Sequence, residues 1–211
     1  MIKDFKLFNS QLLYDADRIS AWCEKYNITN YTINEDGSIS VAGGVMITNG
    51  LPQLPIKFKE VTGFFNCGHS LISLEGCPEE VGSGFYCNTN KLKSLKGCPK
   101  IILGSFHCSD NQLTSLEYCP EYVGGDYSCR KNQITNFDGL PEFFERRIDI
   151  KDNPVHEIYC LFNESPKCIY YLKEYDVIRG MDVVRDRIEE VFDTLGMDIP
   201  EKINLKNYNL V

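Results

Sequence analysis

A 21-residue repeat is the feature that most restricts how this chain can fold. Its fullest copies are FYCNTNKLKSLKGCP, which begins at Phe85, and FHCSDNQLTSLEYCP, which begins at Phe106. The leucine that follows the asparagine, or an apolar residue in its place, recurs at Leu71, Leu92, Leu113, Ile134 and Val155. A weaker copy precedes these, in residues 46–54. A fixed period of this length is typical of a solenoid, in which each repeat forms one coil and buries its apolar side against its neighbours.

The start of each repeat predicts a short strand with two different sides. Phe85 and Cys87 should face the core while Tyr86 and Asn88 face solvent, because successive side chains of a strand point to opposite sides. Parallel stacking of such strands would place like residues on top of one another, so the inward row is monotonous and the outward row is varied. The residues that we expect on the outward row, and take as candidates for binding a partner, are Phe65, Tyr86, Asn88, His107, Ser109, Ser128, Arg130, Asp149 and Lys151.

The first of these strands is assigned by the same 21-residue spacing. That spacing places Phe64 and Asn66 inward, and Phe65 and Cys67 outward. An outward Cys67 two residues before His69 could form a reactive thiol–imidazole pair, although an ordinary surface cysteine is the favoured interpretation.

An asparagine recurs where each predicted strand ends and the chain turns. Its side chain can satisfy backbone groups of the turn, as asparagine and aspartate side chains often do. His69 interrupts the series, so the first turns should be less regular. The predicted structural ladder consists of Asn49, Asn90, Asn111, Asn132 and Asn153.

Two positions of the repeat carry most of the ten cysteines. One position has Cys87, Cys108 and Cys129 but ends in Ile150, and the other ends in Leu140. This exchange with aliphatic residues indicates that each position requires a small buried hydrophobic side chain. Zinc binding is the alternative, but the chain has no Cys-x-x-Cys pair. Disulfides between neighbouring coils are geometrically conceivable, and a reducing compartment argues against them.

Composition and charge limit the class of partner. The 211 residues carry a formal net charge of −8, and no segment is basic, so a phosphate-binding surface for nucleic acid is not expected. The first residues lack the apolar core of a signal peptide, and no apolar run reaches the length of a membrane span. We therefore expect a cytoplasmic protein that does not bind membranes.

The repeat resembles the leucine-rich repeat family, through its L-x-x-N-x-L spacing and the proline after the second apolar block. The 21-residue period is similar to that of the short bacterial subclass. The segment SLEGCPEEVGSGFYC, the leader YTINEDGSISVAGGV and the helical end resemble leucine-rich-repeat proteins of large tailed bacteriophages. This resemblance implies an α+β repeat solenoid with a parallel β-sheet on a concave face and an extended convex side. It also implies a protein that acts in the cytoplasm of a host bacterium.

Both ends of the predicted solenoid need caps, because a stack of coils exposes apolar edges. Residues 1–43 predict an N-terminal helix, with Asp15 or Asp17 as its N-cap, and a β-hairpin that turns at Asp36 and Gly37. Residues 44–156 form the repeats. Residues 157–211 change to helical spacing, with a helix over 183–195 that Gly196 ends. This last segment either seals the solenoid, which we favour, or binds a partner.

The sequence offers little catalytic chemistry. His107 and Cys108 should lie on opposite sides of one strand, and the glycine-rich segments lack the lysine and hydroxyl residue of a phosphate-binding loop. We expect no catalytic residues, no metal and no cofactor. The favoured function is a non-enzymatic protein–protein interaction module that binds, and could inhibit, a host or viral protein through the concave face or the C-terminal helices. The alternative is a structural or virion-associated protein that self-associates through its caps, and an enzyme built on the C-terminal segment is least favoured.

Overall fold

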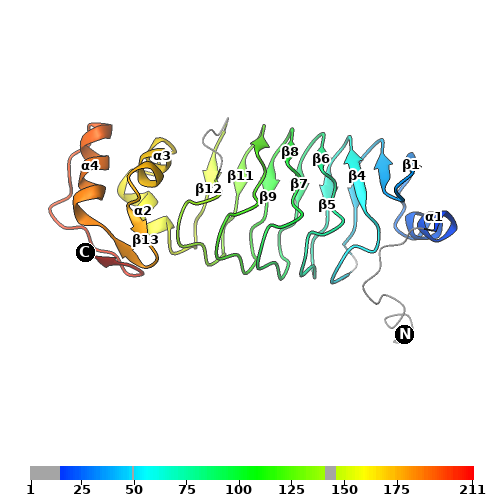
Figure 1. Cartoon of the computed structure of the whole chain (residues 1–211), viewed down its shortest axis with the longest axis horizontal. Helices are drawn as coiled ribbons and strands as arrows, with labels where there is room; N and C mark the ends of the chain where they lie inside the picture. Colours follow the sequence, from blue (N-terminus) through cyan, green and yellow to red (C-terminus); the bar gives the residue numbers. More distant parts are fainter. Residues whose placement is uncertain (1–14, 49, 141–145) are drawn as a thin grey trace.

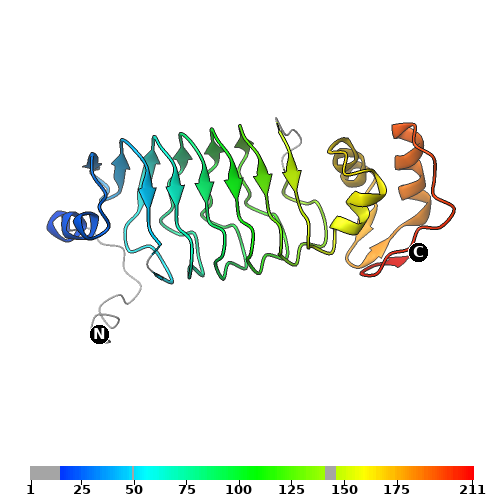
Figure 2. The same cartoon turned by 180° about the vertical axis from the view of Figure 1, so that it is seen from behind.

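The chain folds as an α+β repeat solenoid whose coils stack side by side along its long axis (Figure 1). The structure is a computed structural model of the whole chain, and it describes residues 15–48, 50–140 and 146–211. Seen from either side, α1 lies beyond one end of the stack and α2, α3 and α4 lie beyond the other (Figures 1 and 2). None of the described helices is long and apolar enough to span a membrane.

The strands that the repeat predicts form a parallel sheet, which we call the repeat sheet. Neighbouring strands are offset by 21 residues through most of it, as in the pairing of Phe85 with Phe106 and of Phe106 with Tyr127. Backbone hydrogen bonds connect successive coils, for example from the Cys87 N–H to the His107 carbonyl at 2.8 Å. In spatial order its strands are β3 (Val45–Met46), β5 (Phe65–Asn66), β7 (Phe85–Tyr86), β9 (Phe106–His107), β11 (Tyr127–Ser128) and β12 (Ile148–Asp149).

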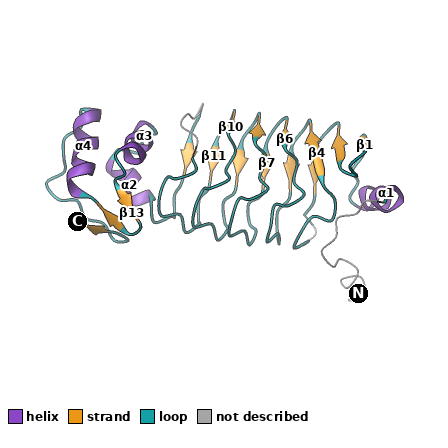
Figure 3. Cartoon of the chain, in the orientation of Figure 1, coloured by secondary structure: helices purple, strands orange, loops and turns teal. Residues whose placement is uncertain are grey.

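The other side of each coil forms a second sheet, where the sequence predicted only an extended chain (Figure 3). A proline, which lacks an N–H, lies two residues before each of the last three strands of this sheet, at Pro78, Pro99 and Pro120, and pairing begins just after it. The Lys100 N–H, for example, donates to the Glu79 carbonyl at 2.9 Å. This return sheet contains β1 (Tyr31–Ile33), β2 (Ile39–Val41), β4 (Phe58–Val61), β6 (Glu80–Val81), β8 (Ile101–Ile102) and β10 (Tyr122–Val123).

The core lies between the two sheets and contains rows of similar apolar side chains stacked from coil to coil. Neighbouring rings of Phe65, Phe85, Phe106 and Tyr127 have centroids 5.7, 6.0 and 5.0 Å apart. All ten cysteines lie within the described residues and are free; seven are buried, Cys98 and Cys119 are partly buried, and Cys160 is exposed. Burial raises the pKa of the Cys87 and Cys108 thiols well above the ordinary value of a cysteine, so both thiols are neutral and unreactive.

The prediction for β5 was wrong by one residue. Phe65 pairs with Phe85 and is fully buried, while Phe64 is 38% exposed. Three residues separate Cys67 from Leu71, whereas four separate Cys87 from Leu92, so this coil is one residue short. A shift of one residue exchanges the two sides of a strand. The inward residues are therefore Phe65 and Cys67, and the outward one is Asn66.

The asparagine side chains hold successive turns together, as the sequence predicts. The Asn132 side-chain oxygen accepts the Leu113 N–H at 3.0 Å, and its NH₂ group donates to the carbonyls of Cys108 and Cys129. Asn90, Asn111 and Asn153 make equivalent hydrogen bonds to the backbone. Asn49 lies outside the described residues. Each asparagine thus bridges its own coil and the preceding one.

The N-terminal cap matches the prediction from sequence. Helix α1 (Ala16–Lys25) begins after Asp15, whose carboxylate accepts the N–H groups of Asp17 and Arg18. Ile19, Trp22 and Cys23 are its buried residues. Strands β1 and β2 form the predicted antiparallel hairpin, and β2 continues into the return sheet by pairing with β4.

The C-terminal segment contains the predicted helices and a small sheet that the sequence did not reveal. Gly196, in the left-handed conformation at φ 65°, ends α4 where expected. Strand β14 pairs antiparallel with β13 and parallel with β15. The elements in chain order are α2 (His156–Leu161), α3 (Lys167–Glu174), β13 (Ile178–Arg179), β14 (Asp182–Val183), α4 (Arg185–Leu195) and β15 (Asn209–Leu210).

Candidate binding face

The outward side of the repeat sheet presents two rows of different side chains, and we call it the repeat face. One row lies directly after the inward aromatic residues and the other lies two positions further along each coil. The sequence correctly places eight residues in these rows, of which seven are half-buried and one, Arg130, is exposed. The residues that the sequence placed there and that the structure also places there are Tyr86, His107, Ser128 and Asp149 in the first row, and Asn88, Ser109, Arg130 and Lys151 in the second.

Phe65 does not belong to the repeat face, because its side chain is fully buried in the aromatic stack. The register of the sheet places Met46 and Asn66 in that row instead, since Met46 pairs with Asn66 and Asn66 pairs with Tyr86. Met46 is 55% exposed. Sequence reasoning missed both residues because it carried the 21-residue spacing into a coil that is one residue shorter.

A polar cleft occupies the C-terminal half of the repeat face, across β9, β11 and β12. Its volume is about 420 Å³. Acidic and basic side chains both line it, so it lacks the single sign of charge that attracts nucleic acid. The charged lining residues are Asp110, Asp126, Asp149, Arg130, Lys131 and Arg147.

The charged side chains of the cleft form loose ion pairs. The Arg130 guanidinium lies 3.8 Å from the Asp149 carboxylate and 3.5 Å from that of Asp152. The Lys131 ammonium lies 3.6 Å from the Asp110 carboxylate, with both side chains more than half exposed. Solvated pairs of this kind contribute about 0–1 kcal/mol to stability. The charged groups of the cleft therefore remain accessible to solvent and are not locked in fixed pairs.

Tyr86 and His107 form an aromatic pair beside the cleft. Their ring centroids are 5.2 Å apart and the planes are tilted by 32°. Desolvation lowers the pKa of His107, and the Asp126 carboxylate opposes this effect. The imidazole is therefore neutral at pH 7 and offers an aromatic surface together with one donor and one acceptor.

The cleft does not assemble a nucleophile with a base. The hydroxyls of Ser109 and Ser128 are 2.9 Å apart and bond to each other, and within the described residues neither is hydrogen-bonded to His107. Cys108 is fully buried on the opposite side of the strand. Among the described residues, the cleft therefore presents hydroxyl, imidazole and charged groups to solvent without a hydrogen-bonded pair of serine and histidine.

The favoured interpretation of Cys67 as a surface cysteine was wrong, and the less favoured Cys67–His69 pair is not formed either. Cys67 is 1% exposed and its thiol donates to the Tyr86 carbonyl at 3.7 Å, while His69 is exposed. The one-residue shortening of this coil turns the thiol into the core. A buried thiol of this kind cannot meet a substrate.

The cysteine ladders do not form a metal-ligand cluster either. Among the described residues, a group of side chains with metal-ligand spacing occurs once, at His156, Cys160 and Glu164. It lies on α2 and the turn after it, outside the repeat face. Comparisons with family models, curated proteins and solved structures gave no match.

Proposed function

We propose that this chain is a non-enzymatic protein-binding module of the leucine-rich repeat type, and that its partner lies against the repeat face. One observation carries the proposal: the inward row keeps the same kinds of apolar residue from coil to coil, whereas the outward row changes its chemistry at each coil. The core requires only the inward row, so the outward row is free to specify a ligand.

The chemistry of the repeat face favours a folded or extended protein segment with both signs of charge. Tyr86 supplies a large rigid contact surface, and Arg130 supplies a planar donor that carboxylates recognise. The mixed charges of the cleft argue against nucleic acid. The resemblance to bacteriophage leucine-rich-repeat proteins supports a host or viral protein in the bacterial cytoplasm as the partner, which binding could inhibit.

Self-association through the caps is the second candidate function. Several large apolar side chains are exposed on the C-terminal segment, among them Tyr170 at 48%, Met181 at 43% and Ile199 at 41%. Exposed apolar residues on an end cap could join two copies or bind a different partner. This alternative describes a structural or virion-associated protein.

The test is affinity capture from bacterial and phage-infected lysates with three versions of the full chain. The first is wild type. The second changes the repeat face, as Tyr86→Ala/His107→Ala/Arg130→Ala. The third is a matched control on or beside the return sheet, Lys59→Ala/Lys100→Ala/Leu103→Ala, at three exposed positions. Circular dichroism and urea unfolding establish that all three are folded.

A protein captured by wild type and by the control, but lost by the repeat-face variant, supports the proposal and identifies the partner. Direct titration of that purified partner should then give a dissociation constant at least about tenfold weaker for the variant, as expected from removing interface anchors. A partner retained equally by all three versions would place binding on the caps or the C-terminal helices. No partner, together with oligomers of the pure chain, would favour self-assembly.

A further inference from the structure

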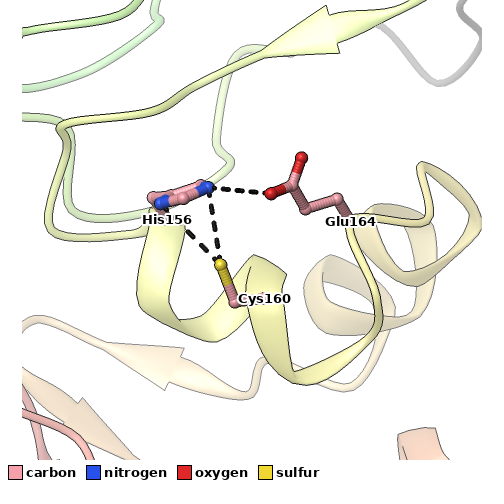
Figure 4. Close-up of side chains that lie close together, drawn as sticks. All are labelled: His156, Cys160 and Glu164. Carbon is pink, nitrogen blue, oxygen red and sulfur yellow. Dashed lines mark hydrogen bonds and ion pairs between the residues drawn. The ribbon is translucent and has the colours of Figure 1, made fainter.

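Three side chains of different chemistry converge at the start of the C-terminal segment (Figure 4). His156 is the first residue of α2, and Cys160 is four residues later, so both lie on the same face of the helix. The His156 Nε2 atom is 3.4 Å from the Cys160 Sγ atom. Glu164 comes from the turn after the helix, and its Oε1 atom is 3.4 Å from the same Nε2 atom.

The turn that returns Glu164 toward the helix is conformationally costly. Asn163 and Glu164 both have φ 53°, in the left-handed region. Asparagine tolerates this region, but for glutamate it costs about 1 kcal/mol or more. The Glu164 N–H donates to the Tyr159 carbonyl at 3.2 Å, which fixes the turn. The backbone therefore holds the carboxylate near His156 before any ligand is present.

The ring nitrogen of His156 that each group contacts distinguishes a metal site from a thiol–imidazole–carboxylate catalytic triad. In such a triad, one ring nitrogen faces the nucleophile and the other faces the orienting carboxylate. Here the shortest contacts of both the Cys160 thiol and the Glu164 carboxylate go to Nε2 of His156, as Figure 4 shows. The thiol lies farther from Nδ1, at 3.8 Å. Both groups therefore lie nearest to the same ring nitrogen, and a cation on Nε2 is shared by all three side chains once the thiol moves from its place near Nδ1 toward the front of Nε2.

The separations of the ligand atoms agree with tetrahedral coordination. With Zn–S near 2.3 Å and Zn–N and Zn–O near 2.0–2.2 Å, tetrahedral angles place neighbouring ligand atoms about 3.4–3.6 Å apart. The His156–Cys160 and His156–Glu164 distances are both 3.4 Å, and all the ligand atoms lie within 4.8 Å of one another. To complete the set, the Cys160 Sγ atom and a Glu164 carboxylate oxygen, which lie within 4.8 Å of each other, must come to about 3.6 Å through rotation of their side chains.

We propose that His156, Cys160 and Glu164 bind one Zn²⁺ ion, with the fourth coordination position open to water. A thiolate, a neutral imidazole and a carboxylate together neutralise the two positive charges of the ion. This mixture of sulfur, nitrogen and oxygen suits Zn²⁺, whereas Ca²⁺ and Mg²⁺ prefer oxygen ligands alone. Cys160 is exposed and the other two side chains are part-exposed, so the ion has direct access from solvent.

The site has a structural consequence for the end of the solenoid. α2 begins directly after the last ladder asparagine and its proline, and Glu164 lies between α2 and α3. An ion held by both ends of α2 would fix the helix and the turn that follows it. Burial and the Glu164 carboxylate raise the pKa of the Cys160 thiol, and the Lys151 ammonium opposes them. A bound cation adds a stronger local charge that favours the thiolate.

The test is a titration of the full, reduced chain with Zn²⁺ in competition with a chromogenic chelator, followed by Co²⁺ substitution. The variants are His156→Gln, Cys160→Ser and Glu164→Gln. The matched control is Cys119→Ser, which removes another partly accessible thiol that lies in the repeats and outside the His156, Cys160 and Glu164 group. We expect wild type and control to bind one ion per chain, to gain thermal stability on binding, and to show a thiolate-to-Co²⁺ absorption band.

Each of the three variants should bind at least about tenfold more weakly than wild type, and Cys160→Ser should lose the absorption band. Circular dichroism of the metal-free proteins separates loss of the site from loss of the fold. Equal Zn²⁺ binding by wild type and Cys160→Ser would overturn the proposal. So would an equal loss in Cys119→Ser, or displacement of Zn²⁺ by an equal concentration of Ca²⁺.

Discussion

At the scale of single residues, the asparagine ladder shows how a side chain replaces missing backbone pairing. Each turn between coils leaves N–H and carbonyl groups without a strand partner, and burial makes such groups costly. The Asn132 side chain offers one acceptor and two donors at the required positions, and is itself only 7% exposed. No other short side chain combines these groups, because aspartate lacks the donors and serine lacks the reach.

Asn132→Ala should lower the free energy of unfolding by about 2–4 kcal/mol, because it leaves the Leu113 N–H without a partner and removes one of the two asparagine donors to each of the Cys108 and Cys129 carbonyls. Asn88→Ala is the matched control. Asn88 lies on the repeat face and bonds only weakly to Thr89, at 3.4 Å, so its loss should cost less than about 0.5 kcal/mol. Urea unfolding of both variants measures the difference. Similar losses for the two asparagines would contradict the structural role of the ladder.

At the scale of elements, the coil of β5 shows that the average repeat length does not determine which side of a strand each residue faces. This coil is one residue shorter than the later ones, so Phe65 rather than Phe64 is buried.

Phe65→Ala should lower the free energy of unfolding by about 3–5 kcal/mol, because it opens a cavity in the aromatic stack. Phe64→Ala removes the same side chain from a partly exposed position and should cost less than about 1.5 kcal/mol. Denaturant unfolding of the two variants decides the register. If Phe64→Ala proved the more damaging, the 21-residue spacing would hold through this coil.

Much of the fold was predictable because it depends on repeated local signals. The strand period, the asparagine turns, the Asp15 cap of α1 and the Gly196 end of α4 are each encoded within a few residues. The return sheet was not predicted, since its strands are two residues long in most coils and pair only through the stacking of whole coils. The same applies to β15, which reaches β14 across more than 25 residues of chain.

The candidate sites differ in how far the sequence reveals them. Alternation along β7, β9, β11 and β12 was enough to place eight residues on the repeat face. The cleft depends on side chains from several coils, including Asp126 and Arg147, which lie just before the strands. The His156, Cys160 and Glu164 spacing of four residues is visible in the sequence, but only the left-handed turn at Asn163 and Glu164 brings the carboxylate back to the helix.

At the scale of the whole molecule, the tail of the C-terminal segment contacts both α2 and the repeats. The Glu157 carboxylate accepts the N–H groups of Lys206 and Asn207, each at 2.8 Å. The Tyr208 hydroxyl donates to the Thr135 carbonyl in the repeats, and Tyr208 is 6% exposed. These contacts favour the interpretation that the segment seals the last coil, because its fastening residues are used within the chain.

The sealing interpretation predicts a monomer, with a mass near 24.1 kDa by light scattering. The double variant Glu157→Ala/Tyr208→Ala releases the tail and should lower the free energy of unfolding by about 3 kcal/mol or more. The released edge should then cause association that increases with concentration. Glu201→Ala/Lys202→Ala, at two exposed tail positions, is the control and should remain monomeric. A wild-type dimer that dissociates when α4 is altered would instead establish the C-terminal segment as an assembly surface. Such a dimer would contradict the sealing interpretation, because the sealing contacts are all made within one chain.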